Sequence, residues 1–248
     1  MPIMASNLYR DMLNFFRNQF SSIILLALLT AIISVIVDQM LSPCSEQLMT
    51  LSNRNIDDSA GMSLQPLVQQ ISVEQQWVLI KVSAARTFAR LVSHVMLAGG
   101  LLTMIHLVTN HKPVSVLRAI GQSLPILPRL LLLMFLATLL VQLGLLIIVP
   151  GIMLAIAFSL APIIATSHNI DAIKSMRISA SLAFANFWLL APAVFLWLII
   201  QASLLLLATP FTMVSSLVAT LLLNIFSNLI SSLLLIYLYR LYMLLRQL

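Results

Sequence analysis

The chain has 248 residues, of which 61% are hydrophobic and only 8% are charged, and its net charge is +6. A soluble domain is about 45–50% apolar and about 25% charged, so this composition excludes a single water-soluble core. The basic residues lie between apolar runs rather than in one solvated cluster, which argues against nucleic-acid binding and favours a role in membrane orientation.

Six apolar runs predict membrane-spanning helices, because about 20 helical residues cross a hydrocarbon core of about 30 Å. The expected spans are residues 20–41, 91–108, 130–149, 152–166, 187–208 and 218–238. The first run is longer than a signal-peptide core and no cleavage site follows it, so we expect an uncleaved anchor. The fold class is therefore all-α: a polytopic membrane helical bundle of six spans with short interfacial amphipathic helices, forming a single domain over residues 1–248.

Residues 42–83 are the one long polar interval and are expected to form an outer loop. Within it, Ser72-Val73-Glu74-Gln75 has the pattern of a capping box, which predicts the start of a helix. No helix breaker follows before Gly99-Gly100, so one helix is expected from Val73 to about Val108. At about 1.5 Å per residue that helix is longer than the bilayer is thick, and its first half must lie outside.

Arg86, Arg90 and His94 are spaced four residues apart and share one face of this helix at the membrane boundary. One interpretation is a site for an anion or lipid head group, with Asp38 near the same end of the first span. The interpretation we prefer is simpler: both arginines extend to the outer head groups and His94 packs against a neighbouring helix.

Two basic segments, before the third and fifth spans, are expected to lie along the inner surface as amphipathic helices. In the first, prolines at 125 and 128 end a short helix whose apolar side carries Val116, Ile120 and Leu124. The second has an apolar face at helical spacing, made of Ile173, Met176, Ala180, Phe184 and Phe187. The candidate contacts for lipid head groups are Arg118, Arg129, Lys174 and Arg177.

Pro150-Gly151 predicts a tight outer reversal between the third and fourth spans, and residues 152–166 form a short, proline-containing run that is tilted little or only partly inserted. Residues 209–217 are expected to be a short uncharged link. Residues 237–242 have the composition of an aromatic and basic belt that anchors the chain end at one surface.

Six spans place both termini on one side, and the basic residues test which side that is. With cytoplasmic termini, nine Lys and Arg residues are inside and four are outside, as the positive-inside rule requires. The four expected outside are Arg54, Lys81, Arg86 and Arg90. Basic lead-ins before the first, third and fifth spans also suggest a threefold repeat, although basic flanks precede most inward-anchored spans.

Catalytic and metal-binding motifs are absent from the sequence. It contains no H-E-x-x-H, P-loop, G-x-S-x-G or Rossmann pattern, its four histidines are scattered, and its single cysteine excludes a cysteine metal cluster. No span carries a paired acid and base, which disfavours an intramembrane hydrolase. We therefore expect no enzyme activity, no cofactor and no metal.

Amide side chains inside the spans are the remaining candidates for a functional site. They are Gln142 in the third span and Asn224 and Asn228 on one face of the sixth, where Ser231 follows. Such residues mark a transport path, or they form hydrogen bonds between helices, which is the interpretation we prefer.

Five segments together resemble the enterobacterial YciC family of uncharacterised inner-membrane proteins. They are LYRDMLNFFRNQF at the start, LAGG at 97–100, LRAIGQSLPILP at 117–128, VPGI at 149–152 and NLISSLLLIYLYRLYMLLRQ near the end. The stretch that begins with VPGI is also loosely similar to the membrane domains of some glycerophosphodiester phosphodiesterases. The resemblance implies a multi-pass inner-membrane protein and supplies no catalytic residues.

Two functions are compatible with these features. The first is a non-catalytic protein that organises the envelope or associates with lipids, with membrane lipids and other inner-membrane proteins as partners. The second is a small transporter or channel whose polar face is formed by Gln142, Asn224 and Asn228.

Overall fold

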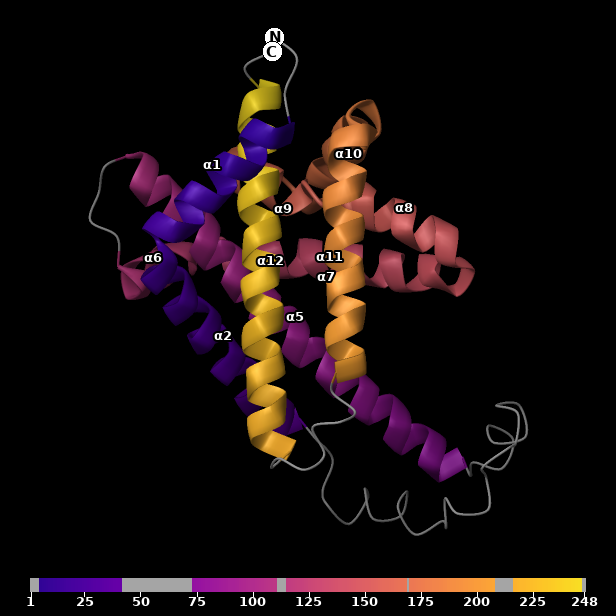
Figure 1. Cartoon of the computed structure of the whole chain (residues 1–248). Helices are drawn as coiled ribbons and strands as arrows, with labels where there is room; N and C mark the ends of the chain where they lie inside the picture. The colour runs from indigo at the N-terminus through magenta and orange to yellow at the C-terminus, as the bar shows by residue number, and fades with distance from the viewer. Residues whose placement is uncertain (1–4, 42–72, 111–114, 169, 208–215, 247–248) are drawn as a thin grey trace.

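The computed structural model describes residues 5–41, 73–110, 115–168, 170–207 and 216–246 (Figure 1). Its helices are α1 (Ala5–Asn18), α2 (Phe20–Leu41), α5 (Val73–Thr109), α6 (Val116–Ser123), α7 (Leu127–Gly144), η2 (Leu145–Ile147), α8 (Ile148–Phe158), α9 (Ala161–His168), α10 (Ala172–Ala185), α11 (Phe187–Leu207) and α12 (Ser216–Arg246). The described residues contain no strand, which confirms the all-α class. Five helical stretches among them are long and apolar enough to cross a membrane, rather than six.

Helices α2, α5 and α12 pack together as the centre of the bundle. Their contact is lined by buried aliphatic side chains such as Ile23, Leu101 and Ile236. Gly100 on α5 lies directly against α2, where an added Cβ would come within 2.9 Å of the Leu26 side chain. Small residues at helix contacts allow this close approach, which favours association in a medium as apolar as lipid.

The long helix predicted from Val73 to about Val108 is confirmed, since α5 runs from Val73 to Thr109 without interruption. The proposed cap at Ser72 lies outside the described residues, as does most of the polar interval 42–83. At 37 residues, α5 is about 55 Å long by the helical rise of about 1.5 Å per residue. Its N-terminal part therefore extends well beyond the hydrocarbon core.

The reversal between α7 and α8 lies earlier than predicted, at Leu145–Ile147 rather than at Pro150-Gly151. Pro150 instead falls in the first turn of α8, where a residue without an N–H leaves no helical hydrogen bond unmade. The two helices cross closely at their glycines. A Cβ on Gly144 would meet the Cα of Gly151 at 2.9 Å.

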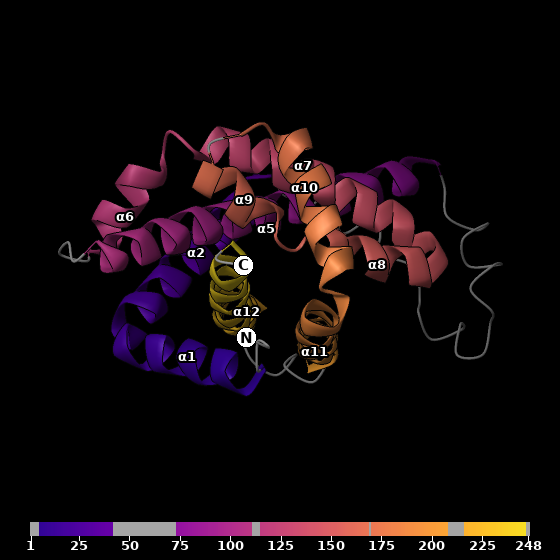
Figure 2. The ribbon, with the colours of Figure 1, turned by 90° about the horizontal axis from the view of Figure 1, so that it is seen from above.

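The predicted fourth span, residues 152–166, is interrupted in the structure. Helix α8 ends at Phe158 and α9 begins at Ala161. With 11 residues, α8 is about 16 Å long and cannot cross a core of about 30 Å alone. Both views show α7 and α8 running across the axes of α11 and α12 rather than beside them (Figures 1 and 2).

The tip of the α7–α8 hairpin is apolar and exposed. Leu146 is 82% exposed and Val149 is 70% exposed, and the neighbouring Ile147 and Ile148 are similar. A contiguous apolar surface of this kind is unfavourable in water and suits a lipid environment.

Tyr237 and Tyr242 in the C-terminal part of α12 are buried against neighbouring helices, which corrects the expected aromatic belt. The rings of Tyr9 and Tyr237 lie 5.1 Å apart, and the Tyr237 hydroxyl donates to the Leu189 carbonyl at 3.0 Å. The Tyr242 hydroxyl is hydrogen-bonded to His168 Nε2 at 2.7 Å. These tyrosines join α12 to neighbouring helices, because α12 continues to Arg246 and packs on α1.

Replacing Gly151 with alanine tests the helix crossing. Its Cβ would lie 2.6 Å from the Leu145 backbone nitrogen, so we expect G151A to lower stability by about 1–3 kcal/mol. The matched control is G121A, because a Cβ there meets nothing within 4 Å and alanine favours a helix by up to about 1 kcal/mol. Thermal unfolding of both variants in detergent is the measurement, and equal melting temperatures would contradict the close crossing.

Candidate polar cavity in the helix bundle

A buried polar node joins α2, α5 and α12. The Asn228 side-chain amide donates to Thr30 Oγ1 at 3.0 Å and to Ser93 Oγ at 3.3 Å, and it lies 3.4 Å from the Ala27 carbonyl oxygen. Ser93 in turn donates to the Thr30 carbonyl at 3.0 Å. All three polar side chains are less than 5% exposed. The node therefore satisfies polar groups that would be costly to leave unpaired in an apolar interior.

A second polar group joins α11 to α12. The Gln201 amide donates to Ser231 Oγ at 3.3 Å and accepts from Ser227 Oγ at 2.9 Å. Trp197 Nε1 donates to Ser231 Oγ at 3.2 Å. The Gln201 amide also lies 3.3 Å from the Ser227 carbonyl oxygen, so side-chain and backbone groups together connect one turn of α11 to one turn of α12.

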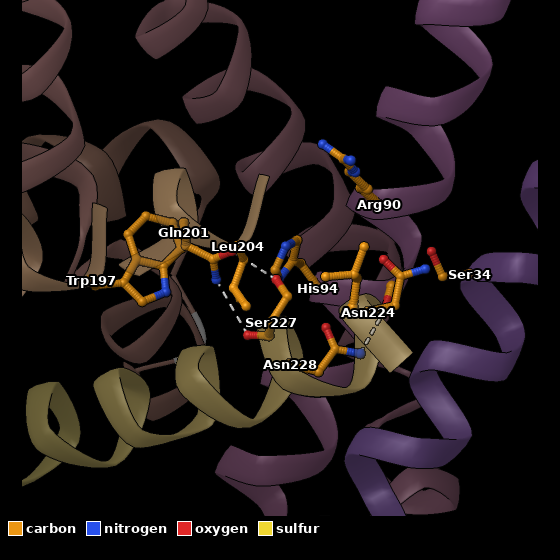
Figure 3. Close-up of a pocket in the computed structure, with 11 residues that line it drawn as sticks. Ser34, Arg90, His94, Trp197, Gln201, Leu204, Asn224, Ser227 and Asn228 are labelled. Atoms are coloured by element: carbon orange, nitrogen blue, oxygen red, sulfur yellow. Dashed lines mark hydrogen bonds between the residues drawn. The ribbon is translucent and has the colours of Figure 1, made fainter. Parts of the chain in front are cut away.

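Between these two groups lies a cavity of about 220 Å³. Residues from α2, α5, α11 and α12 line it: Ser34, Arg90, Ser93, His94, Trp197, Gln201, Leu204, Leu223, Asn224, Ser227 and Asn228. In Figure 3, Trp197 and Gln201 lie on one side of the cavity and Ser34 on the other, with the Arg90 side chain above His94. The lining is polar on the α5 side, whereas α11 and α12 each add a leucine, Leu204 and Leu223, to their polar side chains.

The charge of the cavity is one-sided. Arg90 is the one Lys or Arg among the described residues of its lining, and none of these residues is a carboxylate. Among the described residues, neither the Arg90 guanidinium nor the Asn224 amide has a hydrogen-bond or ion-pair partner. Asp38, one turn beyond Ser34 on α2, is outside the lining and has its own interaction.

The structure brings some of the predicted polar residues together and separates others. Asn224 and Asn228 line the cavity together with Arg90 and His94, which the sequence placed at the membrane boundary. Gln142 is exposed near the end of α7 and does not line the cavity. Asn228 forms hydrogen bonds between helices, which is the interpretation that we preferred for these amides. Asn224, in contrast, lines the cavity.

Sequence reasoning missed the contribution of α11. Gln201 is an amide inside an apolar run, the same signal that identified Gln142, and it was available in the sequence. Trp197 and Ser34 carried no such signal, because a tryptophan or serine in a span is ordinary. Their place in the site depends on which helices are neighbours.

Three of the four candidate head-group contacts are exposed, and the fourth is partly buried. Arg118, Lys174 and Arg177 are exposed, on α6 and α10. Arg129 is partly buried and its guanidinium points to the Ala165 carbonyl at 3.5 Å, near the C-terminal end of α9. A cation at a helix C-terminus is favourable, so Arg129 connects α7 to α9 instead of facing outward.

The apolar face predicted for residues 170–187 is only partly correct. The face of α10 that packs on the bundle consists of Ala172, Ser175, Met176, Ser179 and Ala183. Ser179 Oγ donates to the Ala157 carbonyl at 2.6 Å, so small side chains bring α10 close to α8. Ile173 is 70% exposed and Phe184 is 53% exposed, on the side that also carries Lys174 and Arg177.

No group of three His, Cys, Asp or Glu residues in the described part of the chain could hold a metal ion. His94 lines the cavity and His168 pairs with Tyr242, so these two histidines lie in separate environments.

Asn224 and Asn228 provide a matched pair of substitutions one turn apart. We expect N228A to destabilise the protein by about 0.6–1.7 kcal/mol, because it removes hydrogen bonds between helices. N224A removes an amide without a described partner and should change stability little. Unfolding in mixed micelles measures both; a larger loss for N224A than for N228A would contradict the assignment of the node.

The chain is similar to known proteins over nearly its whole length. A model of an uncharacterised protein family, UPF0259, matches residues 1–244. A UPF0259 membrane protein of Sodalis glossinidius is 74% identical over 249 aligned residues, covering 100% of both chains. UPF0259 membrane proteins of Serratia proteamaculans and Yersinia pestis are 53% identical, covering 99% of this chain and 100% and 97% of theirs.

No solved structure matches the chain. The looser likeness to membrane domains of glycerophosphodiester phosphodiesterases gains no support from these comparisons, whereas the resemblance to the YciC family is consistent with them. The chain is therefore a multi-span membrane protein that belongs to the UPF0259 family.

Proposed function

We propose that this protein is a non-catalytic protein of the bacterial inner membrane that associates with anionic lipids at its cytoplasmic surface and so contributes to envelope organisation. The observation that carries the proposal is the outward face of α10. There Lys174 and Arg177 are exposed beside the exposed apolar side chains of Ile173, Ile178 and Phe184.

The arrangement of α10 suits the boundary between head groups and acyl chains. Its other face is fixed to the bundle by small residues, so the helix cannot turn its exposed apolar side chains inward. Figure 2 shows α10 lying crosswise to α11, which is seen end-on. A helix lying in the interface inserts its apolar side chains and keeps its basic ones near lipid phosphates.

Arg118 on α6 adds a further exposed cation, and α6 packs on α5 and α2. Each basic residue near an anionic surface contributes about 1 kcal/mol, roughly a fivefold change in affinity. Three such residues are sufficient to select anionic over neutral lipid without any deep binding site.

The proposed orientation places the termini in the cytoplasm. Helix α1 packs on the C-terminal part of α12, so the two ends of the described chain share one side. That side carries the exposed cations of α1 and α12, Arg10, Arg17, Arg240 and Arg246. The positive-inside rule then supports a cytoplasmic location for it.

A small transporter or channel is the second candidate, and the cavity beside Asn224 favours it. Two features weigh against transport. Asn228 is held by hydrogen bonds to α2 and α5, and Gln142 is not part of the lining. A transport path through the bundle would require these packed helices to separate.

Removing the charges of α10 tests lipid association. We expect K174Q/R177Q to lower the ratio of retained phosphatidylglycerol to phosphatidylcholine several-fold at low salt, because two phosphate contacts are lost. Native mass spectrometry of the protein from mixed-lipid nanodiscs measures this ratio. The matched control is K81Q/R86Q, two exposed cations on α5. Equal ratios for the two double variants would contradict the role of α10.

Reporter fusions test the orientation. A fluorescent protein fused after the last residue should fluoresce, and alkaline phosphatase at the same position should be inactive, because the C-terminus is cytoplasmic. Active alkaline phosphatase there would reverse the proposed sides. The lipid-contact experiment does not depend on this result, since purified protein has both surfaces accessible.

A further inference from the structure

We propose that the cavity between α2, α5, α11 and α12 binds a phosphate-type anion, supplied by a lipid head group or by free phosphate. The proposed site is distinct from α10, shares no residue with it and does not rest on the proposed function. The two sites carry different cations, Arg90 here and Lys174 with Arg177 there.

The unbalanced charge is the first argument. Arg90 is exposed at the rim of the cavity, where a charged side chain beside a membrane bundle is accompanied by water or by a counter-charge. Among the described residues, no carboxylate lines the cavity and Arg90 has no ion-pair partner. An anion in the cavity would supply the missing counter-charge.

The donors are the second argument. The Arg90 guanidinium offers two parallel N–H groups to a phosphate, and the Asn224 amide offers two more donors without a described partner. The nearby Gln201 and Ser227 are bonded to each other and hold this part of α12 in place. Binding would therefore use two groups that have no hydrogen-bond partner among the described residues.

The size and depth of the cavity select the ligand class. Its 220 Å³ is below the roughly 300–1,000 Å³ of pockets for drug-sized ligands, so it suits one phosphate group with its nearest substituents. Ser34, Gln201 and Asn224 each lie about two turns from the end of their helix, roughly 10 Å along its axis. At that depth, near the side opposite the termini, a lipid phosphate or a free anion can reach the cavity.

Trp197 provides a reporter inside the site, because it lines the cavity. The other two tryptophans, Trp77 and Trp188, are 60% and 89% exposed, so phenylalanine can replace them at little cost. In the W77F/W188F protein, the change in Trp197 fluorescence is recorded in two arms. One arm titrates inorganic phosphate into protein in a neutral detergent, and the other compares phosphatidylglycerol with phosphatidylcholine nanodiscs.

We expect a saturable signal in at least one arm, and the arm that responds identifies the source of the phosphate. Adding R90A should weaken binding at least tenfold, and N224L should weaken it several-fold. R90K should give an intermediate loss, because lysine keeps the charge but lacks the paired N–H groups. The matched control is R86A, one turn earlier on the same helix and outside the lining, which should change binding less than twofold. Melting temperatures of all variants show that each one is folded.

Equal binding by the R90A and R86A proteins would overturn the proposal, as would the lack of a saturable signal in both arms. Either result would mean that Arg90 merely extends to the head groups, like Arg86. The K174Q/R177Q variant separates the two proposals. It should retain the Trp197 signal whether or not α10 selects anionic lipid.

Discussion

The contact of Asn228 with Thr30 and Ser93 fixes how the bundle is assembled. Aliphatic packing between apolar helices is nearly as good in several rotations, because lipid competes for the same surfaces. A hydrogen bond between specific side chains is satisfied in only one rotation of α2, α5 and α12. With these helices fixed, Asn224 one turn away on α12 and Arg90 one turn away on α5 must face the same space. The rotation of the three helices that the Asn228 hydrogen bonds select therefore also places the residues that line the cavity.

Sequence patterns predicted most of the helices, because length, hydropathy and prolines act locally. Helix α5 begins and ends where the capping pattern and the polar residues after Val108 indicated. The interruption between α8 and α9 was not predicted, because hydropathy alone does not detect a break, although Pro162 in the first turn of α9 is a local signal for one. Helical spacing put Met176 on the same apolar face as Ile173 and Phe184, whereas in the structure Met176 is buried against the bundle and the other two are exposed.

The site was less predictable than the fold, for a physical reason. Asn224, Asn228, Arg90 and His94 stand out in the sequence because polar groups in apolar runs are costly. Which of them meet depends on the contacts among four helices, and neither periodicity nor composition encodes these contacts. Gln142 and Gln201 illustrate this limit. Both are amides in apolar runs, yet α7 crosses the bundle and leaves Gln142 outside, whereas α11 brings Gln201 to α12.

The α7–α8 hairpin has a consequence for the topology of the chain. It leaves the bundle and returns to it within one reversal at Leu145–Ile147, so it contributes an even number of crossings at any depth of insertion. A hairpin that is deeply inserted, shallow or level with the surface leaves every later segment on the same side. The side of the membrane on which α10 lies, relative to the start of α7, is therefore insensitive to bilayer thickness near the hairpin.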